Sequence, residues 1–458
     1  MPSTNPPDND FSLYEKRKAI FPKSVSGKRK TIRRYVGFLV YGLLFLIPWI
    51  RIDGEPLVFI DIAQRELTFF NMLFMPQDVF YLAIFLILAA FALFLFTTVA
   101  GRLWCGFVCP QTIWTAIFLF VEEKIQGSSL QRKRENKQEK RFTLKKLLTH
   151  SIWVIISLAT ALSFVGFFYS IYDLIPELLT FQLPLAVAFW VALFTWLTYV
   201  DAGLLREQVC IHMCPYAKFQ SVMYDEDTLI VAYNETNGEP RGSLKSNTGG
   251  GCIDCSLCVQ VCPTGIDIRD GMQLDCINCG LCIDACDHVM TSIGRENNLI
   301  SFSTLNNLAG KPLNWASFLR PKTIAYSLIL VIMTSVLSWK VLNRDLIEAS
   351  IVRERDRMHR FNIKGEVSNF YIIKLTNKSE SAKHLSLSLE GEGFRLVGQP
   401  SWHLLPGENI EAQVIVMSAE KPAGSYPLTF DLHDQTESLD LAPLESRYLY
   451  PVLKNKKP

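Results

Sequence analysis

Eight of the twelve cysteines of this 458-residue chain fall within thirty-five residues, and their spacing constrains the fold more than any other feature. The segment reads C-x2-C-x2-C-x3-C-P from Cys252 to Pro263 and C-x2-C-x2-C-x3-C from Cys276 to Cys286. Three closely spaced cysteines can hold one side of a metal centre, but the fourth ligand has to approach from another direction. Two such runs in series therefore predict a small domain built around two metal centres.

This spacing is typical of bacterial ferredoxins with two [4Fe–4S] clusters, in which the last cysteine of each run serves the other cluster. The first cluster is expected to take Cys252, Cys255, Cys258 and Cys286, and the second Cys276, Cys279, Cys282 and Cys262. Zinc sites favour two C-x2-C hooks with a longer gap, so zinc knuckles or a disulfide framework fit this pattern less well. The pattern predicts one-electron transfer in a reducing compartment.

Long uncharged stretches and a mean hydropathy of +0.18 indicate a membrane protein. A helix crosses a bilayer with about 20 apolar residues. Five stretches meet or approach that length, the two outermost being shorter: Tyr35–Ile50, Val79–Ala100, Ile152–Tyr172, Leu178–Val200 and Thr323–Trp339. A sixth stretch, Phe107–Val121, contains Pro110 and ends in charged residues, so it is predicted to lie at the membrane interface.

The distribution of basic residues predicts the orientation of these spans. Residues 1–34 carry nine Lys and Arg against three acids, and residues 101–151 carry ten against four. Residues 51–78 carry two basic residues against five acids. Because basic segments stay in the cytoplasm, the N-terminus, residues 101–151 and the cysteine-rich segment are expected on the cytoplasmic side, and the chain after the fifth span outside.

The remaining four cysteines form two matching motifs, "WCGFVCP" with Cys105 and Cys109 and "CIHMCP" with Cys210 and Cys214. Each motif follows a predicted span at its cytoplasmic end, so both lie on the side of the iron–sulfur segment. Within a helix, the spacing of four places both sulfurs on one face. The proline after each pair suits the first turn of a new helix, which would leave Cys109 and Cys214 near a helix N-terminus.

These thiols have several possible roles. They are small residues that pack well in a helix bundle, which would give them no chemistry. Two equivalent pairs beside an electron-transfer module instead favour a redox or metal site, and thiolates suit Cu(I), zinc or another iron–sulfur cluster, or cycle as a disulfide. His212 and Met213 favour copper, although both are also common in packing contacts.

The chain after residue 343 has a different character. It contains no cysteine and shows alternation of apolar residues, as in 385–389, 414–416 and 428–432. Short alternating strands separated by polar turns predict an antiparallel β-sandwich of immunoglobulin type, serving as a passive cap or as a docking surface for a partner.

The motifs together resemble the CcoG/FixG/RdxA family, the cytochrome c oxidase accessory proteins, over nearly the whole chain. The resemblance implies a multidomain protein of the bacterial inner membrane: an α-helical transmembrane bundle, a dicluster ferredoxin domain and an immunoglobulin-like β-sandwich on the periplasmic side. The expected segments are a basic tail (1–34), four spans with both thiol motifs (35–220), the ferredoxin domain (221–321), the fifth span (322–342) and the periplasmic domain (343–458).

The resemblance also implies a role in maturing the cbb3-type oxidase, by reduction of Cu(II) to Cu(I) before copper is inserted. The family's thiol motifs correspond to Cys105, Cys109, Cys210 and Cys214. His212 and Met213, which lie between the cysteines of the second motif, are predicted from the sequence itself as further copper ligands. Expected partners are an unidentified electron donor, a copper transporter or chaperone, oxidase assembly factors and membrane lipid, with possible homo-oligomers and no nucleic acid.

Two other functions remain open from the sequence. Quinol-oxidising subunits of the NapH and NosR kind have a similar combination of C-x3-C-P motifs and a dicluster segment. If this chain oxidises a quinol as they do, its four outlying thiols would bind no metal. A copper-binding scaffold without enzymatic activity is the other alternative. No G-x-G-x-x-G motif opens a strand–helix unit, so electrons are expected from a protein or a quinol rather than a nicotinamide.

Overall fold

The computed structural model describes residues 19–451, apart from residues 53, 64, 71, 138–142, 244–249, 313–318, 355–359, 362–365, 380, 392, 399, 419–420 and 437–438. The described residues form two compact units. Those of the first lie within Met1–Arg51 and Ala83–Thr334, and those of the second within Ile52–Leu82 and Ser335–Pro458. Each unit therefore combines segments that are distant in the sequence.

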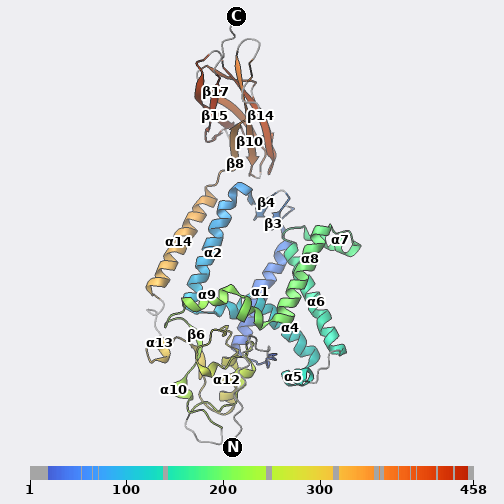
Figure 1. Cartoon of the computed structure of the whole chain (residues 1–458), viewed down its shortest axis with the longest axis vertical. Helices are drawn as coiled ribbons and strands as arrows, with labels where there is room; N and C mark the ends of the chain where they lie inside the picture. The colour runs from blue at the N-terminus through green and yellow to red at the C-terminus, as the bar shows by residue number, and fades with distance from the viewer. Residues whose placement is uncertain are drawn as a thin grey trace, which may run out of the picture. The chain divides into compact units, whose positions relative to one another are not determined.

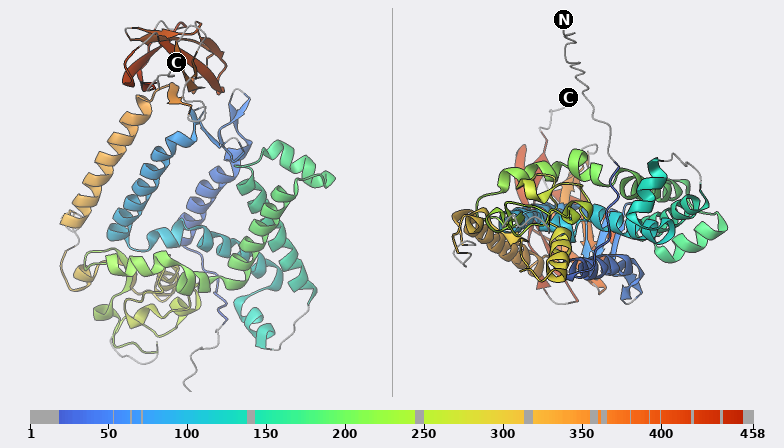
Figure 2. Two further views of the ribbon diagram at one scale, coloured as in Figure 1. Left: turned by 45° about the horizontal axis from the view of Figure 1, so that its top comes forward. Right: turned by 90° about the horizontal axis from the view of Figure 1, so that it is seen from below.

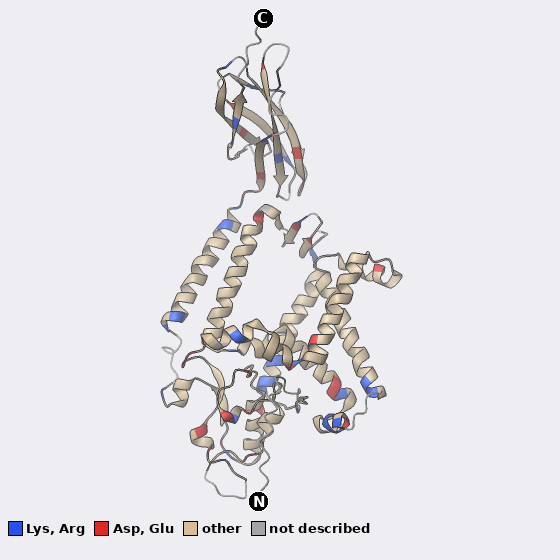
Figure 3. Ribbon diagram, viewed as in Figure 1, with Lys and Arg blue, Asp and Glu red and all other residues tan. Residues whose placement is uncertain are grey.

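The long helices are rich in apolar residues, and six helical segments are long and apolar enough to cross a membrane: Lys28–Trp49, Val79–Ala100, Leu103–Gln126, Leu144–Val165, Leu185–Leu205 and Pro321–Leu342. They contain helices α1 (Lys28–Leu46), α2 (Val79–Ala100), α3 (Leu103–Phe107), α4 (Pro110–Gln126), α6 (Leu144–Val165), α8 (Leu185–Thr198) and α14 (Pro321–Leu342). In Figure 3, charged residues lie mainly near the ends of these helices, as expected for segments that face lipid.

The predicted span boundaries differ from the helices in two places. The predicted span Ile152–Tyr172 begins and ends too late, because α6 begins at Leu144 and ends at Val165, before the short α7 (Ile171–Thr180). The next helix, α8, begins only after Pro184. Uncharged residues continue through the turn between these helices, so an apolar run alone could not locate it. The segment that was expected at the interface also has the length and composition of a span.

Aromatic residues form the centre of the helix bundle. Tyr41, Trp114, Phe118 and Trp153 are buried together, with Phe118 and Trp153 stacked at 5.3 Å between ring centroids. Helices α6 and α8 lie side by side with α7 at their turn (Figure 1). Helices α2 and α14 also run side by side, as Figures 1 and 2 both show, and Tyr326 contacts Phe91 and Phe94 between them.

The cysteine-rich segment folds around a two-stranded sheet and one longer helix. Strand β6 (Ile230–Tyr233) pairs antiparallel with β7 (Ile300–Ser303), and α12 (Leu281–Ser292) packs against β7. The buried core mixes branched apolar residues such as Val231, Ile283 and Ile300 with the cysteines themselves. Thiols therefore supply much of the interior of this segment.

Hydrogen bonds hold the cysteine-rich segment against the ends of the membrane helices. The Asp284 carboxylate of α12 accepts hydrogen bonds from the backbone amides of Arg29 and Lys30, at 3.1 and 2.8 Å, and so caps the first turn of α1. At the end of α2, the Thr228 hydroxyl donates to the Thr98 carbonyl and the Leu229 amide to the Val99 carbonyl, both at 3.0 Å. These contacts fix the segment close to both thiol motifs.

The second unit contains the predicted β-sandwich. One sheet has the order β12-β14-β10-β8 with β9 on β10, and the other the order β13-β11-β15-β16 with β17 on β15. Its longest strands are β10 (Val367–Asn377), β14 (Asn409–Ser418) and β15 (Gly424–Asp434). The alternating residues Leu385, Val416 and Phe430 are buried between the sheets, which confirms the pattern on which the sandwich was predicted.

A three-stranded sheet joins the sandwich in this unit, and nothing in the sequence indicated it. Strands β3 (Val58–Asp61), β4 (Glu66–Phe69) and β5 (Met72–Phe74) form a small meander. Next to it the buried Lys378 ammonium, at the end of β10, binds the carboxylates of Asp78 and Glu348 at 2.7 and 2.8 Å. The Arg344 guanidinium also donates to the Leu73 carbonyl at 3.1 Å.

Candidate functional site: two cluster sites and a thiol quartet

The eight clustered cysteines lie close to one another, and we refer to Cys252, Cys255, Cys258 and Cys286 as the first predicted set and to Cys262, Cys276, Cys279 and Cys282 as the second. Burial raises the pKa of the Cys286 thiol to about 12, and the nearby thiols of Cys258 and Cys252 add to the rise. Burial also raises the pKa of Cys282, with further contributions from Cys279, Cys276 and Cys262 beside it. Cys286 thus lies near Cys252 and Cys258 of the first run, and Cys262 lies near Cys282 of the second, while the assignment of each cysteine to a cluster stays a prediction.

These donors fit [4Fe–4S] clusters. A small cavity between them is lined by Cys258, Cys262, Cys276, Cys279 and Cys282 together with isoleucines. Thiols with a raised pKa are neutral at pH 7, so iron has to displace their protons on binding. When bound, clusters at these positions supply one-electron transfer.

The remaining four cysteines lie in two short breaks of the helical chain. Cys105 is in α3, and Cys109 is the extended N-cap residue of α4 with Pro110 at its first turn. Cys210 is in a π-helical turn, Val209–Met213, and Cys214 is the N-cap residue of α9 (Pro215–Met223). The helix N-termini predicted at Cys109 and Cys214 are therefore present. Neither pair lies on one uninterrupted α-helix, because the chain opens before each proline.

The two motifs converge at one place. Burial raises the pKa of the Cys210 thiol to about 12, and the thiols of Cys109, Cys105 and Cys214 lie near enough to raise it further. The Cys105 thiol donates to the Gln220 side-chain oxygen at 3.6 Å. We call these four cysteines the thiol quartet. Among the described residues, no group of three or more His, Cys, Asp or Glu side chains is close enough together to hold one metal ion.

The two residues between Cys210 and Cys214 face outward. The exposed fraction of Met213 is 62%, and His212 is also exposed. Nearby, the Arg206 guanidinium binds the buried Glu122 carboxylate at 2.7 Å, and Arg132 binds the same carboxylate at 3.4 Å. This ion cluster connects the end of the helical segment Leu185–Leu205 with α4 and α5 (Ser129–Lys137). It explains how charged residues are accommodated beside the quartet.

The quartet lies directly against the second cluster site. A Cβ atom on Gly106 would be 2.7 Å from the Ile277 carbonyl oxygen and 2.8 Å from the Cys279 Cα atom, so only glycine allows this approach. Gly106 is the residue after Cys105, and Cys279 belongs to the second cluster set. Backbone contact therefore brings the two thiol sites to adjacent residues.

Comparison with known proteins shows relatives over most of the chain. Nitrogen fixation protein FixG of Rhizobium meliloti is 37% identical over 432 residues, covering 84% of this chain and 82% of that protein. Protein RdxA of Cereibacter sphaeroides is 37% identical over 449 residues, covering 93% and 94%. The chain belongs to the FixG/RdxA family. Protein RdxB of the same organism is 36% identical, covering 87% of this chain and 88% of that protein.

Family models match the same parts of this FixG/RdxA chain. A "4Fe-4S dicluster domain" matches residues 205–305, an "IG-like fold at C-terminal of FixG" matches residues 337–451, and a "4Fe-4S binding domain" matches residues 82–125. A crystal structure of a FixG-related protein from Vibrio parahaemolyticus is 22% identical, covers 24% of this chain and all of that chain, and has a TM-score of 0.22. The chain is thus an iron–sulfur membrane protein with a C-terminal immunoglobulin-like domain.

Sequence reasoning did not identify two residues of this FixG/RdxA site. Gly106 is part of the motif "WCGFVCP", but its role as a point of close backbone approach depends on a loop 171 positions later, at Ile277. Arg33 was counted only as part of the basic tail. In the structure its side chain is buried beside Cys279, and its guanidinium opposes the rise in the pKa of that thiol which burial causes.

Proposed function

We propose that this chain reduces Cu(II) to Cu(I) at the thiol quartet, using electrons delivered through the iron–sulfur sites. The observation that carries the proposal is the backbone contact between Gly106 and the Cys279 loop. It leaves no room for a side chain between the second cluster site and the quartet, so electrons have a short path. Soft sulfur ligands favour Cu(I) over Cu(II), so the reduced ion is the better bound product.

Copper would be held by thiols of the quartet, which lie near one another and are the soft ligands that Cu(I) prefers. Cu(II) accepts one electron there and leaves as Cu(I). Arg102, buried beside the quartet, favours the thiolate form of Cys210. His212 and Met213 are exposed, which suits residues that pass the ion to or from the thiols.

The biological purpose that we propose is assembly of the copper centre of cbb3-type cytochrome c oxidase in the bacterial inner membrane. The family resemblance supports this purpose. The basic segments support a cytoplasmic position for the ferredoxin segment and a periplasmic one for the sandwich. An electron donor, a copper transporter or chaperone and assembly factors are then the partners.

The test uses purified protein under anaerobic conditions. The clusters are reduced with dithionite, excess reductant is removed, Cu(II) is added, and Cu(I) is trapped with a specific chelator while cluster absorbance is followed. We expect Cu(I) in proportion to cluster reoxidation. Cys105→Ser and Cys214→Ser should abolish Cu(I) formation while the iron content stays unchanged.

Control variants separate the alternatives. Val222→Leu changes an exposed residue of α9, keeps the four thiols and should reduce copper at a normal rate, and Cys255→Ser should lose iron and all reduction. Loss of iron in Cys105→Ser would instead make the quartet a ligand set for a further cluster, which the family model over residues 82–125 also fits. Normal Cu(I) formation in the quartet variants would contradict the proposed site.

A further inference from the structure

A large cavity opens beside the second cluster site. It has a volume of about 650 Å³ and lies between α1, α4, α6 and the loops that carry the second set of cysteines. Most of its lining is apolar, including Tyr41, Phe45 and Trp114. A cavity of this size with aromatic walls and a few polar groups is typical of a small-molecule site.

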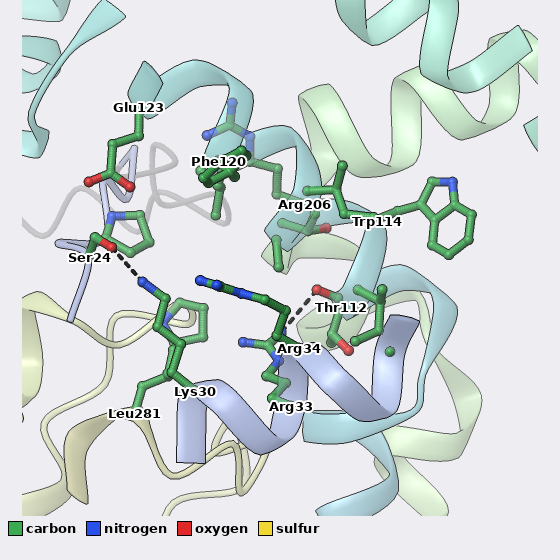
Figure 4. Close-up of a pocket in the computed structure, with 18 of the residues that line it drawn as sticks. Ser24, Lys30, Arg33, Arg34, Thr112, Trp114, Phe120, Glu123, Arg206 and Leu281 are labelled. Carbon is green, nitrogen blue, oxygen red and sulfur yellow. Dashed lines mark hydrogen bonds between the residues drawn. The ribbon is translucent and has the colours of Figure 1, made fainter. Parts of the chain in front are cut away.

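The polar groups of the cavity are concentrated at one end. Figure 4 shows Lys30, Arg33 and Arg34 of α1 facing Thr112 and Glu123 of α4. Arg33 is 9% exposed, and its guanidinium donates one hydrogen bond to the Thr112 carbonyl at 3.0 Å. Its buried Nε–H has no partner in the part of the chain that the structure describes. A buried donor without an acceptor is available to the oxygen of a ligand.

The cavity also opens toward the lipid. Phe38, Ile117 and Phe120 line it and are 79%, 39% and 54% exposed on the outside of the bundle. On helices that cross a membrane, such residues contact acyl chains. The cavity therefore suits a ligand with a polar head and a hydrophobic tail that enters from the bilayer.

The position of the polar end distinguishes a redox ligand from a structural lipid. Thr264 lines the cavity, and its hydroxyl lies 3.3 Å from the sulfur of Cys262, a member of the second cluster set. The cavity is also lined by Ile277, which follows Cys276, and by Leu281, which precedes Cys282. Cys210 of the quartet lines it as well. Only one side chain would therefore separate a bound head group from the electron-transfer sites. A redox-active head group can exchange electrons at this position, whereas the phosphate group of a lipid cannot.

From these contacts we propose that the cavity binds a membrane quinol, which supplies the electrons for the cluster sites. The inference rests on the proposed electron-transfer function and names its donor. Oxidation of the quinol to quinone releases two electrons and two protons. One electron goes to each of the two cluster sites, and the protons go to the Glu123 carboxylate and to water. Arg33 is a positioning residue whose charge favours the deprotonated quinol oxygen, the stronger reductant.

Two pairs of variants test the site. Arg33→Gln removes the buried charge, and Lys28→Gln removes an exposed charge of the same helix that does not line the cavity. Gly42→Trp fills the cavity, because a Cβ atom on Gly42 meets no atom within 4 Å, and Gly42→Ala adds only a methyl group at the same place. Both controls should leave the site intact.

Two readouts are needed. The first is anaerobic reduction of the cluster absorbance in the full chain by decylubiquinol, with dithionite as a reference that needs no site. The second is binding of heptyl-hydroxyquinoline N-oxide, a quinol analogue, followed by quenching of its fluorescence. We expect Gly42→Trp to abolish both, and Arg33→Gln to weaken binding about tenfold or more, as expected for loss of a charged hydrogen bond. Lys28→Gln, Gly42→Ala and all dithionite reductions should match the unmodified chain.

Failure of the quinol site and failure of the copper proposal give different results. If decylubiquinol does not reduce clusters that dithionite reduces, or if Gly42→Trp behaves like Gly42→Ala, the quinol proposal is wrong while dithionite-driven copper reduction is unaffected. If vesicles of phosphatidylglycerol displace the analogue and decylubiquinol gives no reduction, the cavity is a lipid site and the proposal is also wrong.

Discussion

At the residue scale, Gly106 controls how closely the thiol quartet approaches the second cluster site. Gly106→Ala places a methyl group against the backbone of Ile277 and Cys279, so α3 has to move away. The gap that an electron has to cross then widens, and electron transfer slows as this gap widens. We therefore expect Cu(I) formation to be several-fold slower, with unchanged iron content, measured in the dithionite assay.

Gly42→Ala serves as the control for Gly106→Ala, since it makes the same change in a membrane helix where the added methyl group meets open space. Equal rates in both variants and in the unmodified chain would show that the approach at Gly106 does not limit electron transfer.

A second residue-scale prediction concerns Asn278, inside the C-x2-C hook of Cys276 and Cys279. Its φ is 51°, a left-handed conformation, and its side-chain oxygen accepts hydrogen bonds from the Val231 amide at 3.3 Å and, as long as no iron is bound, from the Cys276 thiol at 3.6 Å. Asn278→Ala loses these bonds and adds strain of about 1 kcal/mol, whereas Asn278→Gly loses the bonds without strain. We expect the Ala variant to release iron faster than the Gly variant when both are exposed to oxygen. The reverse order would contradict the strain argument.

The spacing of the cysteine runs predicted a domain with two [4Fe–4S] clusters because this spacing is local, and the family model over residues 205–305 agrees with it. Which cysteine binds which cluster stays a prediction. Arg33, Gly106 and the lining of the cavity could not be predicted, because their roles come from contacts with loops far along the chain.

At the scale of elements, Lys378 joins the three-stranded sheet segment to the sandwich. Its side chain is 6% exposed and binds both Asp78 and Glu348, so Lys378→Met leaves two partly buried carboxylates without a cation. We expect a loss of about 2 kcal/mol in the free energy of unfolding of this unit, smaller than for a fully buried pair because both carboxylates touch solvent. Thermal unfolding followed by circular dichroism measures it.

Lys374→Met provides the matched control for Lys378→Met. Lys374 lies on β10 and pairs with Glu411, but both side chains are more than half exposed, at 53% and 58%. Exposed pairs contribute little, so this variant should be nearly neutral. A comparable loss of stability in both variants would mean that Lys378 acts only through its aliphatic chain.

Element boundaries were predicted best where two signals agree. Val79–Ala100 is both uncharged and flanked by turns, and its predicted and observed bounds coincide. The sandwich strands were correct because alternation and polar turns coincide. The sheet β3-β4-β5 was missed because each of its strands has at most four residues, too short for a reliable pattern.

At the scale of the whole molecule, the two units depend on metal to different degrees. The core of the cysteine-rich segment includes Cys252, Cys258 and their neighbours, whereas the core of the sandwich consists of side chains such as Tyr371, Phe430 and Tyr448. Removal of iron should therefore destabilise the first core and leave the second unchanged.

Limited proteolysis tests this difference. After oxidative removal of iron with a chelator, we expect cleavage within residues 221–305 while a fragment that contains the sandwich survives unchanged. Protein with intact clusters is the control and should resist cleavage in both regions. Equal resistance before and after iron removal would show that the apolar residues alone stabilise the cysteine-rich core.

The general architecture was predictable because each part has its own pattern: cysteine spacing, apolar length or alternation. The connections between parts were not, because single hydrogen bonds between distant residues make them. The capping of α1 by Asp284 is the clearest example, since 255 positions separate Arg29 from its partner.

That cap also sets an order of events during synthesis. The first membrane helix leaves the ribosome long before residue 284 exists, so its first turn has to remain without this cap while the next spans are inserted. Docking of α12 can follow only after the cysteine-rich segment has been translated and folded. The last step of assembly at this end of the helices is therefore the docking of α12 onto the first turn of α1. In this way, metal loading of the cysteine-rich segment is coupled to completion of the first membrane helix.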